Sequence, residues 1–373
     1  MHNTLKGNTV LSRKQCDVLR GLAIIGIFLH NFCHWFNGGH SENEFLYYKE
    51  HGLTSWNYWT GGGIDCFAPI QFFSFFGHYG VPLFLFLSGF GLVMKYERED
   101  AKHIKILPFL GTHWLKLFKL MSLGYILSVL VYVVWCGKTP QLWYEVLSQL
   151  MLVTNFFFYT PGGALRPVPY WFFGLMFEVY IFYRLFIYST RDKATWRWLM
   201  PLVFVVLAWL MMMPCENHPG GLNYLRYNAT VAILPFSIGV LLARYGLPKI
   251  QKWALAAVAI VSLPLIAIAN LDFQAWLWAP VFVVAGSVAF VKLFEGCSTE
   301  KFLKPLAWMG VMSSYIFVVH SLPRLPIFQF GLLWQHEQLR YVDYAWLALY
   351  IVITMILAWL YKQYMKLLNN RKL

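Results

Sequence analysis

Apolar runs long enough to cross a membrane recur along the whole chain, and this repetition constrains the fold more than any single motif. Of the 373 residues, 59% are hydrophobic and 13% are charged, whereas a soluble domain carries about 25% charged residues. So few charges cannot cover a water-facing surface, which indicates an integral membrane protein. Backbone polar groups inside a bilayer must bond to one another, so helices are the expected elements.

We therefore expect an all-α polytopic bundle of about ten transmembrane helices, in one membrane domain that covers residues 1–373. The predicted spans are 18–36, 78–95, 114–136, 170–188, 196–214, 228–244, 252–270, 274–294, 306–322 and 342–362. The apolar run 146–158 is too short to cross a hydrocarbon core of about 30 Å easily. It is expected to be an interfacial or re-entrant piece.

The loops between these runs divide the basic residues unequally. One side receives Lys and Arg clusters at every loop. The other side receives only Lys49, Lys138, Arg166, Arg226, Arg324 and Arg340. Lys and Arg accumulate on the cytoplasmic side of a membrane, so both termini are expected to be cytoplasmic. The net charge of +13 belongs to this topology signal, which argues against a nucleic-acid partner.

The first apolar run carries two histidines. At about 1.5 Å of rise per residue, His30 lies about 15 Å beyond Arg20, near the middle of the hydrocarbon core. His34 follows four residues later and shares the same helix face. A titratable group at that depth should face a protein interior or a water-filled cavity, and imidazole suits proton transfer near neutral pH. These histidines are candidate catalytic residues, while Arg20 either lines the same cavity or anchors the helix at the interface.

Two further polar groups lie inside predicted spans. Glu178 is an acid well within the fourth span, where an unpaired carboxylate needs a cation such as His30 or an arginine; a structural ion pair is the alternative. Ser88 lies on a helical stripe with Gly77 and Gly91. Small residues on such a stripe either let helices approach closely or leave room for a ligand beside the hydroxyl.

Four segments together resemble the acyltransferase 3 family of membrane acyltransferases. They are LRGLAIIGIFLH at 19–30, GVPLFLFLSGFGL at 80–92, PYWFFGLMFEVY at 169–180 and LAWMGVMSSYIFVVH at 306–320. A weaker correspondence is LPFSIGVLLARY at 234–245. These segments follow the family order and cover nearly the whole chain.

The resemblance implies a ten-helix core that transfers an acyl group, usually acetyl from acetyl-CoA. The implied acceptor is a glycan or lipid-linked sugar on the far side of the membrane, and the implied location is the bacterial inner membrane. HWLKLFK at 113–119 lies where the family carries a pair of basic residues. The expected acyl-CoA site consists of Arg20, His113, Lys116, Lys119 and Ser88. No metal is predicted.

The chain departs from the family pattern in its first helix. The family places ten residues between the arginine and the histidine, but nine separate Arg20 from His30, and Asn31 occupies the family position. A shift of one residue turns a side chain by about 100° around the helix. The resemblance therefore leaves both His30 and His34 as candidates for the base.

In the resulting hypothesis, His30 acts as general base on the acceptor hydroxyl or relays the acyl group, and Glu178 orients it. Aromatic and basic residues near the outer side are expected to hold the sugar. The expected acceptor site consists of Tyr170, Trp171, Arg226 and His320. The other interpretation of His320 is a histidine bonded within the core, and a structural role is likewise the other interpretation of Arg226.

Two other function classes stay open on sequence alone. A membrane redox protein would need axial haem ligands, and a Soret absorption band would identify it. The candidates are His30, His34, His78 and His320. A transporter or flippase would show broken helices with paired Gly or Pro positions in two halves, and no such halves are apparent in the sequence.

Overall fold

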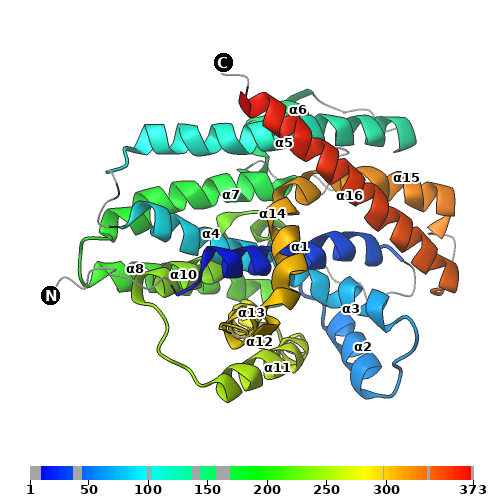
Figure 1. The fold of residues 1–373 in the computed structure, drawn as a ribbon, viewed down its shortest axis with the longest axis horizontal. Helices are drawn as coiled ribbons and strands as arrows, with labels where there is room; N and C mark the ends of the chain where they lie inside the picture. Colours follow the sequence, from blue (N-terminus) through cyan, green and yellow to red (C-terminus); the bar gives the residue numbers. More distant parts are fainter. Residues whose placement is uncertain are drawn as a thin grey trace.

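The computed structural model describes residues 10–36, 44–98, 101, 103–136, 143–156, 169–296, 298–333 and 337–370. Within these ranges the chain forms helices, turns and irregular segments and no strand, which confirms the predicted all-α class. Figure 1 shows the helices gathered into one bundle.

Each of the ten predicted spans overlaps a helix in the described part of the chain. These helices are α1 (Arg13–Cys33), α4 (Gly80–Tyr96), α5 (Ile106–Cys136), α7 (Trp171–Phe182), α8 (Trp196–Met212), α10 (Ala229–Tyr245), α11 (Lys252–Ala269), α13 (Ala279–Leu293), α14 (Lys304–Val319) and α16 (Tyr341–Asn370). Eight described stretches are long and apolar enough to cross a membrane, whereas α10 and α13 are apolar but shorter, at 17 and 15 residues. The predicted polytopic membrane bundle is confirmed.

Short elements connect these helices. The shorter helices are α2 (Lys49–Thr60), α3 (Ala68–Phe76), α6 (Trp143–Leu150), α9 (Pro219–Leu225), α12 (Phe273–Trp276) and α15 (Ser321–Gly331). The tight 3₁₀ segments are η1 (Gly77–Tyr79), η2 (Thr154–Phe156), η4 (Tyr188–Thr190), η5 (Met213–Glu216) and η6 (Ser298–Leu303), and η3 (Tyr183–Ile187) is a wider π-helical segment. The run predicted as an interfacial piece, 146–158, overlaps α6 and η2, and its last two residues lie outside the described ranges.

The second span begins earlier than the sequence pattern predicted. Helix α3, turn η1 and α4 follow one another without a break, so the apolar stretch covers Ala68–Tyr96. A proline in its first turn starts α3, where the missing N–H costs no helical hydrogen bond. The tight turn η1 contains Gly77 and His78 and brings the His78 ring to the first helix.

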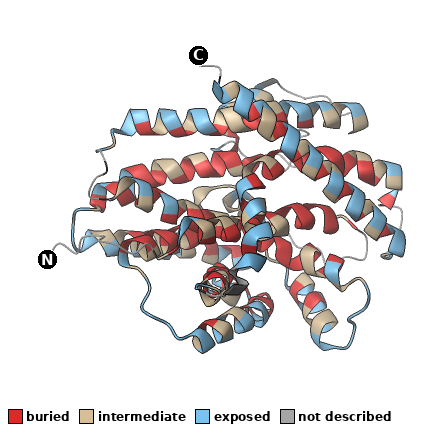
Figure 2. Cartoon of the chain, viewed as in Figure 1, coloured by how far each residue is buried: buried red, intermediate tan, exposed pale blue. Residues whose placement is uncertain are grey.

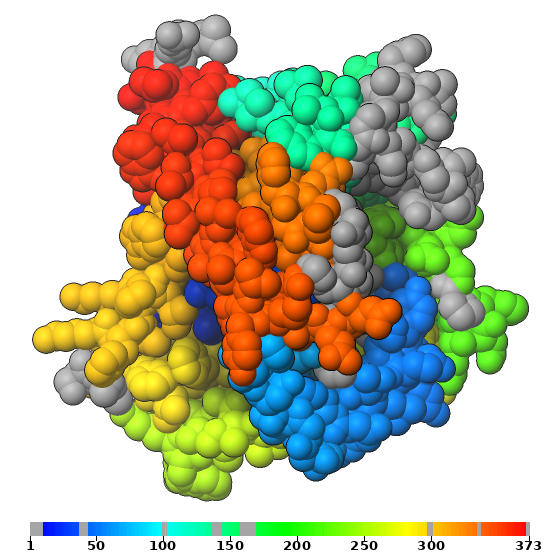
Figure 3. All heavy atoms as spheres, turned by 90° about the vertical axis from the view of Figure 1, so that its right-hand side faces the viewer, coloured from blue at the N-terminus to red at the C-terminus, as the bar shows by residue number. Residues whose placement is uncertain are grey.

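Burial separates central from peripheral helices (Figure 2). In the most apolar 18-residue part of each helix, 72% of the residues of α1 and 78% of those of the α3–α4 stretch are buried. The corresponding share is 22% in each of α5, α8, α11 and α16. The apolar outer faces of the peripheral helices therefore have lipid as their natural neighbour. Figure 3 shows one side of the bundle, where α2 and α3 lie below α15 and α16.

Glycines hold α1 close to its neighbours. A methyl group at Gly21 would collide with the backbone of α14, and one at Gly310 would collide with the backbone of α1. On another face of α1, a methyl group at Gly77 would lie 2.5 Å from the carbonyl oxygen of Gly26 and 2.6 Å from Cβ of His30. Backbones approach this closely only where side chains are absent. The glycines thus place α1 at the centre of the bundle.

A buried ion pair joins the ends of two further helices. Arg244 at the end of α10 donates from Nε and Nη2 to the two carboxylate oxygens of Glu97, at 2.8 and 2.9 Å. Both side chains are almost completely buried. Tyr183 also donates to Glu97, at 3.0 Å. This paired fork is the geometry in which a buried arginine is best compensated.

Candidate active site

Three imidazoles form a cluster inside the bundle. His30 is fully buried, and its ring stacks on that of His34 with centroids 4.6 Å apart. The ring of His78, in η1, lies 5.3 Å from that of His30. The four-residue spacing on α1 stacks the first pair, and the turn η1 brings in the third ring. The sequence indicated His30 and His34 as a pair, but not that His78 joins them.

Hydrogen bonds determine which ring nitrogen of His30 is free. Nδ1 lies 3.2 Å from the carbonyl oxygen of Phe73, and Nδ1 of His34 lies 2.7 Å from the carbonyl oxygen of His30. A carbonyl only accepts, so both Nδ1 atoms carry protons in the tautomers that this network favours. Nε2 of His30 is buried and has no hydrogen-bond partner among the described residues. Its lone pair is therefore available to accept a proton.

A fully buried arginine lies at the same cluster. Arg324, in α15, donates from Nη1 to the backbone and side-chain oxygens of Asn31, at 3.1 and 3.2 Å. Its guanidinium covers the ring of Trp35 at 4.1 Å, and its charge acts on both His30 and His34. Sequence reasoning counted this arginine only as an outer-loop charge. Its position within the apolar run SLPRLPIFQF was the signal that was available.

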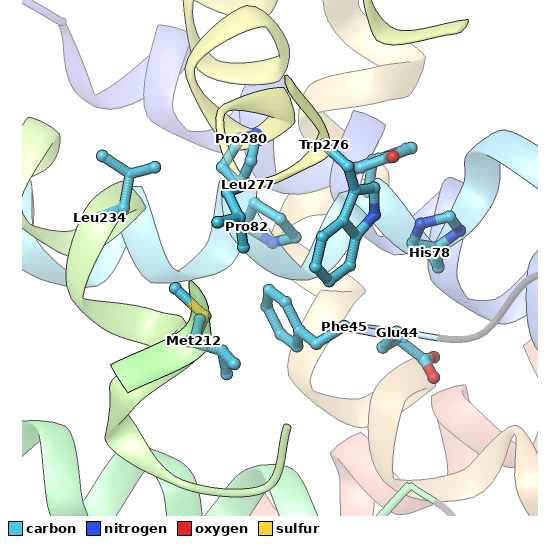
Figure 4. Close-up of a pocket in the computed structure, with 11 residues that line it drawn as sticks. Glu44, Phe45, His78, Pro82, Met212, Leu234, Trp276, Leu277 and Pro280 are labelled. Atoms are coloured by element: carbon cyan, nitrogen blue, oxygen red, sulfur yellow. The ribbon is translucent and has the colours of Figure 1, made fainter. Parts of the chain in front are cut away.

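A narrow pocket reaches the cluster from the side of His78. Its cavity of about 30 Å³ holds about two water molecules. Figure 4 shows Glu44 and His78 at one end of this pocket, with Met212 and Leu234 at the other. The Glu44 side chain is buried, and its charge acts on His30. Sequence reasoning missed Glu44 as well, because nothing in the surrounding loop residues marks it as buried.

Glu178, in α7, contacts the beginning of α10, and no hydrogen bond or ion pair to these imidazoles is found among the described residues. Its Oε2 accepts a hydrogen bond of 2.8 Å from the backbone N–H of Ala229, the first residue of α10. Its Oε1 is buried without a hydrogen-bond partner in the described part of the chain. The expected partner was His30 or an arginine, and the structure offers a helix N-terminus, where a carboxylate is favoured by the helix dipole.

The predicted acceptor residues divide between two surroundings. Trp171 and Arg226 share a neighbour, because the ring of Tyr227 lies 5.5 Å from Trp171 and its hydroxyl accepts a 2.6 Å bond from Arg226. Asn155 donates to the carbonyl oxygens of Trp171 and Tyr227 and ties this group together. Tyr170, in contrast, is enclosed in the core.

Two other members of that predicted site are buried. The Tyr170 hydroxyl donates to the carbonyl oxygen of Val318 at 2.6 Å and accepts from Ser128 at 3.2 Å. His320 is fully buried at the end of α14 with Nδ1 2.9 Å from the carbonyl oxygen of Phe317. Its Nε2 has no hydrogen-bond partner within the described ranges, and the charge of Arg324 acts on it. The same arginine therefore acts on His320 and on the rings of His30 and His34.

The predicted donor residues on α1 and α5 occupy one end of the bundle. Figure 1 shows that both helices begin at the end where α4 finishes. Arg20 pairs with Asp17 at 2.7 Å, and the ring of His113 packs between Phe109 and Tyr180. Lys116 is exposed.

The other two predicted donor residues lie further along the helices. Lys119 is half-buried, one turn beyond the exposed lysine of α5. Ser88, in α4, donates 2.9 Å to the carbonyl oxygen of Phe84 and approaches the sulfur of Met176. Among the described residues, no group of three or more His, Cys, Asp or Glu side chains is arranged to hold a metal ion.

Comparison with known proteins gives one match, to a family model. The model described as the acyltransferase domain, acyltransferase 3, matches residues 13–362. No curated protein and no solved structure matches the chain significantly. The match includes the histidine cluster, the buried arginine and both groups of predicted substrate residues. The chain thus belongs to the acyltransferase 3 family, and it is a multi-pass membrane acyltransferase.

Proposed function

We propose that this enzyme transfers an acyl group, acetyl in the simplest case, from acyl-CoA to a hydroxyl group of a glycan or lipid-linked sugar. The observation that carries the proposal is the buried His30 imidazole, whose Nδ1 is held by a backbone carbonyl and whose Nε2 is free. An imidazole held in one tautomer by its second nitrogen is the arrangement that a general base requires.

The chemistry follows from that free nitrogen. Nε2 of His30 accepts the proton of the acceptor hydroxyl while the hydroxyl oxygen attacks the thioester carbonyl carbon. The carbon–sulfur bond then breaks, and the imidazolium returns the proton to the departing CoA thiolate. His34 and His78 pack against the ring of His30 on two sides. Their role in this proposal is to hold the base in position.

The two substrates approach from opposite ends of the bundle in this proposal. Acyl-CoA phosphates meet Lys116 and Lys119 at the end where α1 and α5 begin. The distribution of basic loop residues supports a cytoplasmic orientation of this end. Both termini are then cytoplasmic, and a bacterial inner membrane is the proposed location. The acceptor approaches near Trp171 and Arg226, which are joined through Tyr227.

Removal of the His30 imidazole tests the base. We expect His30→Ala to lower kcat for acyl transfer by about 100- to 10,000-fold, the usual range for a general base. The assay follows labelled acetyl from acetyl-CoA into envelope glycans, with mass spectrometry of the product. His103→Ala is the matched control, because it removes an exposed imidazole from the loop before α5.

His34→Ala should be measured beside it, since the family spacing leaves both histidines as candidates. Loss of activity in the His34 variant alone would move the base by one helical turn. If both variants are folded and fully active, the proposed mechanism is rejected.

A further inference from the structure

Among the described residues, Arg324 is the most buried of three buried arginines, the others being Arg184 and Arg244, and it lacks the carboxylate partner that Arg244 has. Arg244 is paired with both oxygens of Glu97. Arg324 is 1% exposed, yet no carboxylate among the described residues lies within 4 Å of it. Its Nε is buried without a hydrogen-bond partner in the described part of the chain. Glu44, whose charge acts on His30, makes no ion pair with it.

An uncompensated buried charge is strongly unfavourable, so proteins pair such groups or use them for binding. Neutral groups already hold Arg324 in one place: Asn31 accepts from Nη1, and the Trp35 ring covers one face of the guanidinium. These contacts orient the side chain without neutralising it. The counter-ion is therefore expected to arrive with a ligand.

The charge balance favours a carboxylate over a phosphate. A phosphate group carries close to two negative charges at neutral pH, and Arg324 is a cation whose charge acts on both the buried His30 and His34 rings. A carboxylate carries one charge, which one guanidinium balances. The planar fork of arginine also matches the two oxygens of a carboxylate.

We propose that Arg324 binds a carboxylate group of a substrate beside the histidine cluster, so that the enzyme prefers an anionic substrate over its neutral analogue. This inference rests on the proposed acyl transfer near His30. The carboxylate has two chemical sources: the free end of a dicarboxylic acyl group carried by CoA, or a uronic acid unit of the acceptor glycan. Asn31 and Trp35 are the positioning residues for the guanidinium.

Binding measured without turnover tests the site directly. The full-length protein in detergent is titrated with succinate and glucuronate, with succinamide and glucose as neutral counterparts and inorganic phosphate as the competing anion. Thermal unfolding reports binding, because a ligand of the folded state raises the melting temperature. We expect at least one carboxylate to raise it in a saturable way, while its neutral counterpart does not.

Substitution of the arginine gives the second arm. Arg324→Met should weaken binding of that carboxylate by about ten- to a hundredfold, the usual loss for a bond to a charged group. Arg324→Lys should retain part of the affinity for the carboxylate, because lysine keeps the charge without the planar fork. Arg340→Met is the matched control, since it removes an exposed arginine from the same region of the chain.

The two sources are separated by competition assays on the wild-type protein. Preferential transfer from succinyl-CoA over acetyl-CoA assigns the carboxylate to the acyl group, and preference for a glucuronate-containing acceptor over a glucose-containing one assigns it to the acceptor. Equal binding of charged and neutral probes, or stabilisation by phosphate alone, overturns the proposal. Both results are obtained with the wild-type protein, so they do not depend on whether an Arg324 variant folds. Because binding is measured without turnover, the carboxylate site can be rejected while the proposed acyl transfer is retained. In the same way, the acyl transfer can be rejected while carboxylate binding is observed.

Discussion

At the residue scale, the hydrogen bonds of each polar side chain decide what it is free to do. His30 uses Nδ1 on the carbonyl oxygen of Phe73 and keeps Nε2 free. Glu178 uses one oxygen on the N-terminus of α10 and keeps the other free. The sequence predicted that both groups lie inside apolar spans. It could not predict their hydrogen-bond partners, because Phe73 is 43 residues from His30 and Ala229 is 51 residues from Glu178. In the proposed enzyme, Glu178 is a positioning residue on the acceptor side.

Replacement of Glu178 by glutamine tests that role. We expect Glu178→Gln to lower kcat by about five- to tenfold with little change in the KM for acyl-CoA, since a hydrogen bond to a neutral acceptor is weaker than one to a carboxylate. The glutamine carbonyl can still accept from Ala229, so α10 should begin at the same residue. Steady-state kinetics with each substrate varied in turn would make the measurement.

Glu295→Gln provides the control for that experiment, because it removes a more exposed carboxylate that pairs with Lys292. A Glu178→Gln protein with unchanged kcat and a lowered melting temperature would show that the carboxylate only stabilises the start of α10.

At the scale of elements, glycine contacts determine how the central helices meet. The stripe on α4 and η1 had two interpretations, close packing or room for a ligand. Gly77 is in close contact with α1, whereas a methyl group at Gly91 would meet nothing within 4 Å. Packing therefore accounts for one end of the stripe and not the other. The contact at Gly77 also touches Cβ of His30, so helix packing and the position of the base are coupled.

Alanine at Gly77 tests this coupling. The added methyl group must displace α1 or η1, and overpacking of this kind typically costs about 1–3 kcal/mol. We expect Gly77→Ala to lower the thermal stability and to reduce kcat further than the stability loss explains, because His30 is pushed away. Thermal unfolding and acyl-transfer kinetics on the same preparations would show both effects.

Gly91→Ala is the matched control on the same stripe and should be neutral or slightly stabilising, since alanine favours helix over glycine by up to about 1 kcal/mol. If both variants behave alike, the close contact between η1 and α1 has no influence on the site.

At the scale of the whole molecule, the proposed reaction needs the bundle to connect a phosphate-bearing donor at one end with a sugar at the other. The beginnings of α1 and α5 lie together at one end (Figure 1). The histidine cluster lies in the second half of α1, at His30 and His34. In the proposed transfer across the membrane, the thioester reaches into the bundle while the CoA phosphates stay near Lys116.

A charge reversal at Lys116 tests the donor end. We expect Lys116→Glu to raise the KM for acyl-CoA by about tenfold or more, because a contact with phosphate is lost and a repulsion is added. The KM for the acceptor should change much less. Lys304→Glu, at the exposed beginning of α14, is the control. An equal rise in both KM values for the Lys116 variant would indicate a general disturbance rather than a donor site.

Sealed vesicles test the proposed crossing of the membrane. Acyl-CoA supplied only at the face that carries the termini should label an acceptor held only at the other face. A requirement for both substrates on one face would reject the transmembrane route while leaving the acyltransferase activity in place.

The sequence by itself determined the elements and the family. Whether a segment enters a membrane depends on its own composition, so the ten apolar spans followed from local sequence, and four motifs in order indicated the acyltransferase 3 family. Only the tertiary structure decided which groups meet. Arg324 contacts Asn31 across 293 positions of the chain, and His78 approaches His30 because glycines let η1 and α1 touch. Such contacts depend on shape complementarity between distant helices, which no local pattern encodes.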